Sequence, residues 1–202
     1  MTTTSLPPGF PADPIAGLLG WIDEAAAAGV REASACALAT VGPGGRPSAR
    51  MVLARGFVEG GFAFYTDYGS RKGGELAENP ACALVFHWRE LERQARVEGV
   101  ARRLSADASD AYFARRPRQS RLSAAASQQS RPLASREQLE ALVAELETRY
   151  DDKPIPRPDT WGGFAVVPDA IELWRGHPAR LHWRVRYERG GDGVFVPTSL
   201  QP

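Results

Sequence analysis

Lysine is scarce in this chain of 202 residues, because only Lys72 and Lys153 occur among its 25 lysines and arginines. The cations are nearly balanced by 24 acidic residues, which leaves a formal net charge of +1 at pH 7. This balance excludes a surface that is basic throughout and would bind nucleic acid or membranes without selectivity. It leaves room for a local cationic cleft.

Cysteine and histidine are also rare, which argues against a metal centre. Cys36 and Cys82 each lie in an apolar run, "ACALAT" and "ACALVF", where a buried thiol is the expected role. The three histidines, at positions 87, 177 and 182, form no ligand pattern, so we expect no metal site. The chain also lacks a Ser-His-Asp order, a His-Glu-x-x-His motif and a Cys-x-x-Cys motif. Chemistry supplied by a bound cofactor suits this inventory better.

Long apolar runs and targeting segments are missing as well. No stretch approaches the roughly 20 consecutive apolar residues of a membrane-spanning helix. The first ten residues, "MTTTSLPPGF", contain no cationic segment followed by an apolar core, as a secretory signal would. We therefore expect a cytoplasmic protein that binds neither membranes nor nucleic acid.

The remaining pattern predicts one domain over residues 13–202, preceded by a flexible arm over residues 1–12. Asp13 and Pro14 open a helix that stops at Gly29. A short helix is expected through residues 75–78, and two further helices are expected at 105–115 and 135–150. The helix at 135–150 would have four apolar residues facing inward: Leu139, Leu142, Val143 and Leu146. Strands are expected at 34–41, 47–54, 60–67, 81–88, 93–104, 162–168, 170–176 with 180–189, and 193–200.

The order of these strands indicates how they pair. They follow one another as hairpins, without the regular helical crossovers that a parallel sheet requires. The long segment 93–104 alternates small or apolar residues with charged ones, so one of its faces should be buried. We therefore expect a mostly β fold, an antiparallel barrel flanked by helices.

The stretch "YTDYGSRKGGEL" (65–76) is a candidate anion site. A turn at Gly69 and Ser70 leads into a helix start, where unpaired N–H groups and the helix dipole favour negative charge. Arg71 and Lys72 stand side by side at that start, so a hydroxyl, a guanidinium and an ammonium could hold a phosphate. An ordinary solvated helix start is the alternative. Cations of the strand at 50–55 could converge on the same anion or extend to solvent.

Two further groups of residues suggest binding. In "DAYFARRPRQS", Tyr112 and Arg116 lie one helical turn apart with Ser120 just beyond, a set that suits a phosphate monoester. In "RLHWR" (180–184), strand alternation predicts that the first, third and fifth side chains share one face. Three potential cations would then lie together, although a solvent-facing strand would explain them equally.

Seven motifs occur in order and together resemble the pyridoxine/pyridoxamine 5′-phosphate oxidase family. They are "RMVL" (50–53), "FYTDYGSRK" (64–72), "LERQARVEG" (91–99), "YFARRPRQS" (112–120), "SQQS" (127–130), "WGGF" (161–164) and "ELWRG…RLHWR" (172–184). The resemblance implies a split β-barrel homodimer with flavin mononucleotide (FMN) at the subunit interface. It also implies an oxidase that transfers a hydride from C4′ of pyridoxine or pyridoxamine 5′-phosphate to flavin N5. Dioxygen then reoxidises the flavin, giving hydrogen peroxide and pyridoxal 5′-phosphate.

The resemblance also implies roles for individual residues. Those similar to the FMN-binding positions are Arg50, Met51, Val52, Leu53, Tyr65, Thr66, Arg71, Lys72, Gln94, Gln129, Ser130, Trp174 and Arg184. Among these, Arg50, Arg71 and Lys72 would hold the FMN phosphate. The residues similar to those that bind substrate are Arg55, Tyr112, Arg116, Ser120, Arg180 and His182, of which Arg180 and His182 would face the pyridine ring as the catalytic pair.

The chain departs from the family pattern mainly at the substrate end. Arg55 stands where the family commonly has a lysine, and Trp183 replaces an acidic residue. The arm before residue 13 has neither the arginine nor the tyrosine that covers the substrate, and the ending "TSLQP" lacks an arginine. A different substrate, such as a dihydrophenazine-type aromatic of secondary metabolism, is therefore an alternative. A non-catalytic protein that binds flavin or pyridoxal phosphate is a third reading.

Overall fold

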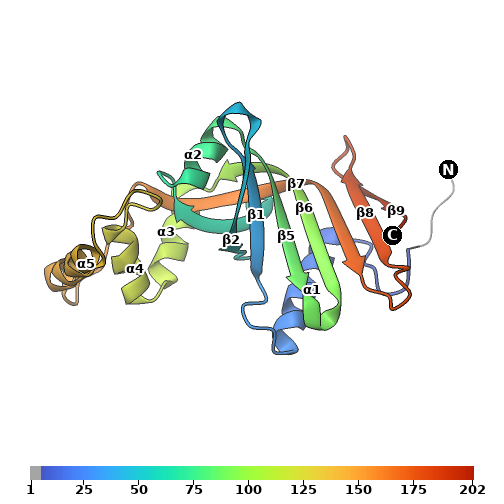
Figure 1. Ribbon diagram of the computed structural model, residues 1–202, viewed down its shortest axis with the longest axis horizontal. Helices are drawn as coiled ribbons and strands as arrows, with labels where there is room; N and C mark the ends of the chain where they lie inside the picture. The colour runs from blue at the N-terminus through green and yellow to red at the C-terminus, as the bar shows by residue number, and fades with distance from the viewer. Residues whose placement is uncertain (1–5) are drawn as a thin grey trace.

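Residues 6–202 of the computed structural model form an antiparallel sheet surrounded by helices (Figure 1). The strands are β1 (Ala35–Val41), β2 (Pro47–Leu53), β3 (Phe57–Val58), β4 (Gly61–Asp67), β5 (Ala81–Trp88), β6 (Arg93–Arg103), β7 (Trp161–Arg175), β8 (Trp183–Arg189) and β9 (Phe195–Ser199). The helices are α1 (Pro14–Ala27), α2 (Arg71–Glu78), α3 (Ala106–Arg115), α4 (Arg118–Ala126) and α5 (Arg136–Tyr150), with 3-10 turns η1 (Pro43–Gly45) and η2 (Arg89–Leu91).

The sheet is a barrel that stays open on one side. Its strand order is β2-β1-β5-β6-β7-β4-β3, with β8 paired to β7 and β9 to β8. Within residues 6–202 no ladder joins β2 to β4. The segment after β2 bridges this gap, because Arg55 N donates to Ala63 O at 2.7 Å and Ala63 N donates to Gly56 O at 2.9 Å. The predicted antiparallel split barrel flanked by helices is confirmed.

Strand β7 corrects the prediction of two separate strands around Pro168. It is continuous over 15 residues and pairs with β6, with β4 through its first half and with β8 through its second half. The ladder passes over Asp169 of β7 next to Pro168, because the consecutive residues Glu98 and Gly99 of β6 pair with Ala170 and Pro168. A Cβ at Gly99 would lie 2.0 Å from Val167 O, so only glycine permits this close approach of the two backbones.

Helix α1 follows the sequence prediction closely. Asp13 caps its start, with Oδ1 accepting from the backbone N–H groups of Ile15 and Ala16, and Gly29 follows its end with a φ of +83°. Leu18 and Trp21 are buried and belong to the core inside the barrel. None of the helices in residues 6–202 has the length and apolar composition that a bilayer span requires.

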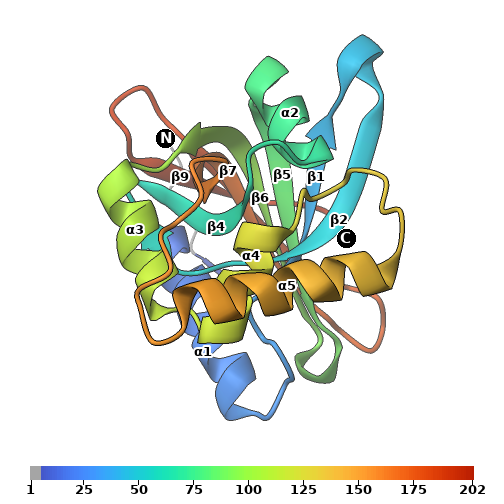
Figure 2. The same ribbon diagram turned by 90° about the vertical axis from the view of Figure 1, so that its left-hand side faces the viewer.

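Helices α3, α4 and α5 stack at one end of the sheet, as Figure 2 shows. The sequence did not predict α4, because its nine residues offer only Leu122 and Ala126 as buried side chains. The expected inward face of α5 is only partly correct. Val143 and Leu146 are half-buried against α4, whereas Leu142 is exposed, because α5 packs on one side only.

The predicted flexible arm is partly described. Residues 1–5 lie outside the described part of the chain, but residues 6–12 pack on the domain. Phe10 is buried, with its ring centroid 6.0 Å from that of Trp21 and the Arg175 guanidinium over its face. The hydroxyl of Tyr187 donates to Pro11 O at 2.7 Å. The end of this segment is therefore part of the packed structure.

Replacing Phe10 with alanine should lower the free energy of unfolding by about 3 kcal/mol, the usual cost of removing a buried phenylalanine. Urea unfolding at one fixed protein concentration measures this. Leu142→Ala, on the exposed side of α5, is the control and should change stability by less than about 0.5 kcal/mol. Equal midpoints for Phe10→Ala and the parent would show that residues 6–12 add nothing to stability.

Candidate functional site

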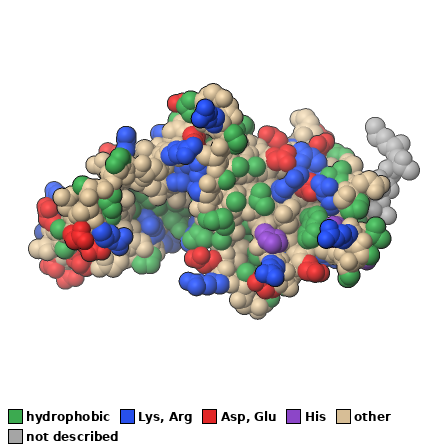
Figure 3. Space-filling model, in the orientation of Figure 1, with side chains coloured by type: hydrophobic (Ala, Val, Ile, Leu, Met, Phe, Trp, Pro, Cys, Tyr) green, Lys and Arg blue, Asp and Glu red, His purple; other side chains and the backbone are tan. Residues whose placement is uncertain are grey.

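A cavity of about 650 Å³ opens between β2, β4, α2 and the α3–α4 pair. Arginine and lysine side chains gather in this region, between the helices at the left of Figure 3 and the sheet. The predicted residues that line the cavity are Met51, Val52, Leu53, Arg55, Tyr65, Thr66, Lys72, Tyr112, Arg116, Ser120 and Gln129. Its wall also contains Arg115, Pro117 and Trp161, which the sequence analysis did not identify.

Lys72 occupies a polar corner of this cavity. Its Nζ donates to Gln129 Oε1 at 2.6 Å, to Thr66 Oγ1 at 2.9 Å and to Ser70 Oγ at 3.3 Å. Burial and, next, the charge of Arg50 lower the pKa of Lys72 to about 8. Burial is the larger cause, and the negative charges of Asp67 and Glu75 offset it only in part, so an anion bound at this corner would stabilise the ammonium.

Arg50 and Arg71 are both bound to the buried carboxylate of Glu75. Arg50 Nη2 donates to Oε2 at 2.9 Å and Arg71 Nε donates to Oε1 at 2.9 Å. The hydroxyls of Thr40 and Ser48 also donate to Oε2. Burial raises the pKa of Glu75, but the hydrogen bonds from these four donors outweigh it and bring the pKa to about 2. Glu75 is therefore a carboxylate at any pH at which the protein works.

The opposite kind of group, a cation with an unsatisfied donor, occurs at Arg116. Its guanidinium lies 4.7 Å from the centroid of Trp161, and its buried Nη1 has no hydrogen-bond partner among residues 6–202. Burial lowers the pKa of Arg116, and the nearby charge of Arg55 lowers it further. A buried guanidinium nitrogen beside a second cation calls for an anionic ligand. Tyr112 and Ser120 line the same cavity.

The other predicted residues form a second group on strands β6, β7 and β8. Gln94, Trp174 and Arg184 are direct neighbours across the three strands. This group lies at the other end of β7 from the cavity wall at Trp161, because β7 begins with Trp161 and carries Trp174 near its end. At about 3.3 Å per residue, their Cα atoms are on the order of 40 Å apart. Figure 1 shows β8 and helices α3–α5 at opposite ends of the molecule.

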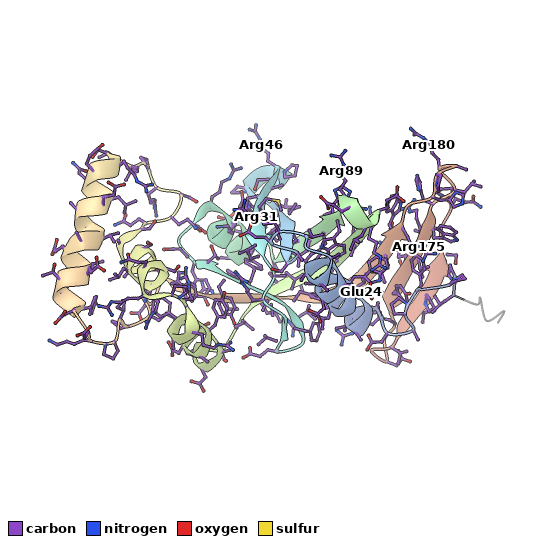
Figure 4. The ribbon with its side chains drawn as sticks, turned by 90° about the horizontal axis from the view of Figure 1, so that it is seen from below. Glu24, Arg31, Arg46, Arg89, Arg175 and Arg180 are labelled. Atoms are coloured by element: carbon purple, nitrogen blue, oxygen red, sulfur yellow. The ribbon has the colours of Figure 1, made fainter. Side chains whose placement is uncertain are left out.

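Arg180 is placed differently from the prediction. Strand β8 begins only at Trp183, and Arg180 lies in the preceding turn with a φ of +59°. Its side chain is exposed and points outward (Figure 4). The expectation that Arg180, His182 and Arg184 share a strand face was therefore wrong for Arg180. His182 packs on Trp174 with ring centroids 4.7 Å apart, and its Nδ1 accepts from the backbone N–H of His177.

Comparison with known proteins assigns the family. The family model described as "Pyridoxamine 5′-phosphate oxidase" matches residues 22–150. A second model, described as "Pyridoxine 5′-phosphate oxidase C-terminal dimerisation region", matches residues 161–202. The chain belongs to the pyridoxamine 5′-phosphate oxidase family. As a member of this family, it is an FMN-dependent oxidoreductase, which confirms the resemblance on which the sequence analysis relied.

Individual relatives agree with this assignment. The chain is 55% identical over 194 residues to the pyridoxine/pyridoxamine 5′-phosphate oxidase of Rubrobacter xylanophilus, covering 96% of this chain and 89% of the relative. It is 50% identical to the enzyme of the same name from Cupriavidus pinatubonensis, covering 94% and 89%. Among solved structures, PhzG from Burkholderia lata, in complex with tetrahydrophenazine-1-carboxylic acid, has a TM-score of 0.91, 35% identity and full coverage of both chains. A related FMN-binding protein from Nostoc punctiforme has a TM-score of 0.76 at 19% identity, covers 96% of this chain and all of that one, and supports the fold.

The residues of the Lys72 corner fit the phosphate of FMN. Arg71 binds Glu75 through its Nε and its side chain is 67% exposed, so its terminal nitrogens, which donate to no group in residues 6–202, can bind a ligand. Lys72 adjoins it and brings the depressed pKa that a dianion would relieve. Arg50 is less free, because its Nη1 and Nη2 already donate within the protein. Arg50 would act on the phosphate chiefly through its charge.

Three contributors to the site escaped the sequence analysis. Trp161 stacks with Tyr65 and Tyr112 at centroid distances of 5.7 and 6.3 Å. The motif "WGGF" that contains Trp161 does not indicate which way its side chain faces. Arg115 lies inside the motif "YFARRPRQS", directly before Arg116, and only its position distinguishes it from that neighbouring arginine. Glu75 stands one helical turn after Arg71, and this i, i+4 spacing was the only available signal.

Replacing Lys72 with alanine should weaken FMN binding roughly 10- to 150-fold, because a hydrogen bond to a charged group contributes about 1.5–3 kcal/mol. Titration of the flavin-free protein with FMN, followed by flavin fluorescence, measures this. The only other lysine of the chain, Lys153, is exposed and provides a matched control in Lys153→Ala. Similar FMN affinities for both variants would contradict this placement of the phosphate.

FMN binding should also weaken as the pH rises above about 8. Lys72 loses its proton near that pH in the free protein, and a neutral amine attracts the phosphate less than an ammonium does. The ratio of FMN to riboflavin affinity should fall between pH 7 and 10, since riboflavin has the same ring system without the phosphate. In Lys72→Arg the ratio should stay level, because arginine keeps its charge throughout this range. An equal decline in the parent and in Lys72→Arg would rule out Lys72 as the titrating group.

Proposed function

We propose that the protein oxidises pyridoxine or pyridoxamine 5′-phosphate to pyridoxal 5′-phosphate. The observation that carries this proposal is that one cavity holds two groups suited to anions: the Lys72 corner and Arg116, whose Nη1 has no hydrogen-bond partner in the described part of the chain. One would hold the FMN phosphate and the other the substrate phosphate. The names of the Rubrobacter and Cupriavidus relatives support the same substrates.

The substrate phosphate would be bound by Arg116, Tyr112 and Ser120, with Arg55 as a second cation. All four line the cavity, and a guanidinium with hydroxyl groups provides both charge-assisted and neutral hydrogen bonds. Arg55 keeps the charge of the lysine that the family commonly has there but offers a planar fork of donors instead of a point charge. This difference should change the orientation of the phosphate more than the strength of its binding.

The FMN would lie between two chains of a homodimer. Met51, Val52, Leu53, Tyr65 and Thr66 would line it on one chain, with Gln129 and Ser130 nearby, and Gln94, Trp174 and Arg184 would reach it from the other. Along β7 of a single chain, Trp161 in the cavity wall and Trp174 are on the order of 40 Å apart, so a second copy would bring Trp174 and Arg184 to the cavity. The matched dimerisation region contains Trp174 and Arg184. Exposed apolar side chains such as Met51 and Leu181 would be covered by the partner.

The chemistry requires a hydride acceptor, which bound FMN supplies. For pyridoxine phosphate, loss of a hydride from C4′ and a proton from its hydroxyl gives the aldehyde, and dioxygen takes up two electrons and two protons as hydrogen peroxide. The protein's part is to hold the ring in position, where small displacements cost large factors in rate. Arg180 and His182, supplied by the partner, would fix the pyridine ring. The exposed turn at Arg180 suits contact with another chain.

A second candidate function keeps FMN and changes the substrate. The likeness to PhzG, with a TM-score of 0.91, favours a reduced phenazine-type aromatic. Trp183 adds aromatic surface beside His182, with its ring centroid 4.9 Å from that of His177. An aromatic carboxylic acid, however, would bring a single charge to a cavity that holds Arg55, Arg115 and Arg116. The cationic lining favours the phosphorylated vitamer.

Replacing Arg116 with alanine should raise the apparent KM for pyridoxamine phosphate more than about tenfold with little effect on kcat, because the phosphate is remote from the reacting carbon. Peroxide release in steady-state assays measures both constants. Arg136→Ala, an exposed arginine on α5, is the control and should leave both unchanged. FMN content is measured alongside, so that loss of cofactor is not mistaken for loss of substrate binding.

The same assay separates the two candidate functions. The parent protein should release peroxide with pyridoxamine phosphate and much less with pyridoxamine, which lacks the phosphate. Activity with a dihydrophenazine carboxylic acid alone would overturn the vitamer proposal in favour of the second candidate. The cytoplasmic location expected from the sequence stays a prediction.

A further inference from the structure

Glu75 has no role in the proposed chemistry, yet it is the most densely hydrogen-bonded carboxylate beside the cofactor region. Its side chain is 5% exposed. Oε2 accepts from Thr40 Oγ1 at 2.5 Å, Ser48 Oγ at 2.7 Å and Arg50 Nη2 at 2.9 Å, and Oε1 accepts from Arg71 Nε at 2.9 Å. A buried carboxylate is costly unless it is fully paired, and this one is.

These contacts connect three separate elements at one point. Arg50 and Ser48 come from β2, Thr40 comes from β1, and Arg71 belongs to the same helix as Glu75. The two arginines expected near the FMN phosphate therefore share one carboxylate. Among residues 6–202, the hydrogen bonds that connect the Arg71 guanidinium with that of Arg50 run through Glu75.

The charges also favour an anion. Arg50, Arg71 and Lys72 are the cations around this corner, and the carboxylates of Glu75 and Asp67 oppose them without cancelling all three, so the corner stays net positive. A phosphate monoester carries close to two negative charges at neutral pH. Glu75 thus reduces repulsion among the cations before the ligand arrives, while the corner still attracts the phosphate.

We propose that Glu75 is a positioning residue for the FMN phosphate. Its carboxylate holds the guanidiniums of Arg50 and Arg71 in their binding arrangement in the free protein. The binding of FMN therefore does not have to order these two side chains, which lowers the entropic cost of association. The opposite view is that Glu75 competes with the phosphate for both arginines, in which case its removal would tighten binding. The inference rests on the placement of the phosphate at Arg71 and Lys72.

The test compares FMN with riboflavin, which lacks the phosphate. Flavin-free full-length protein is titrated with each, for the parent, Glu75→Gln and the control Glu78→Gln. Glu78 lies on the same helix and is exposed. Glu75→Gln should weaken FMN binding about tenfold or more, as expected for disturbed charge-assisted contacts, and change riboflavin binding less than about twofold. Glu78→Gln should bind both flavins like the parent.

Glu75→Asp guards against a failure to fold and tests the position of the charge. Aspartate keeps the carboxylate but shortens its reach by one methylene, so the FMN affinity of Glu75→Asp should lie between those of the parent and Glu75→Gln. If Glu75→Gln does not fold, Glu75→Asp alone should show weaker binding of FMN with little change in the binding of riboflavin. Unchanged or tighter FMN binding, or an equal loss of both flavins, would overturn the proposal. These outcomes are independent of the substrate, because no vitamer is present. Lys72→Ala is tested in parallel. If it also leaves FMN affinity unchanged, the placement of the phosphate is wrong; if it weakens FMN binding and Glu75→Gln does not, only the role of Glu75 is wrong.

Discussion

The backbone pairing of β7 is the constraint on which the architecture depends. This strand hydrogen-bonds to β4, β6 and β8, so the barrel and the β8–β9 extension share one backbone. Its continuity past Pro168 relies on the absence of a side chain at Gly99, where the backbone of Val167 passes. The separation between the cavity at Trp161 and the residues around Trp174 follows directly from the length of this strand.

Two buried carboxylates each organise a pair of arginines. Glu75 binds Arg50 and Arg71 beside the cavity. Glu172 binds Arg184 at 3.0 Å and Arg96 at 2.6 Å beside the second group. In each case a buried glutamate binds two guanidiniums. Those bound by Glu75 come from a strand and a helix, and those bound by Glu172 come from two different strands. Such pairs contribute little net stability, because desolvation offsets attraction, but they fix geometry well. Each lies among residues that we expect to bind the planar, charged cofactor.

Much of the fold was readable from the sequence where the signals are local. The start of helix α1 was predicted from the cap at Asp13 and from Pro14, and strand β6 was predicted from the alternation of residues 93–104. Both signals depend only on neighbouring residues, and both predictions were correct. Helix α4 has too few apolar residues to show a period, and its formation depends on packing against α5. The turn that carries Arg180 was misread because a strand pattern does not reveal where pairing stops. The partnership of Glu75 with Arg50 spans 25 positions in the sequence, and no local pattern encodes it.

The scarcity of lysine has a chemical consequence for a cavity that would release an aldehyde. Amines condense with aldehydes to Schiff bases, and guanidinium groups, which stay protonated, do not. The cations toward the substrate side, Arg55, Arg115 and Arg116, can therefore attract a phosphate without capturing the product. Lys72 is the one amine in the cavity lining, and its lowered pKa of about 8 would make it reactive if it were left open. A cofactor phosphate seated on Lys72 would restore its charge and shield it, so the same contact that binds FMN would keep the enzyme from trapping its own product.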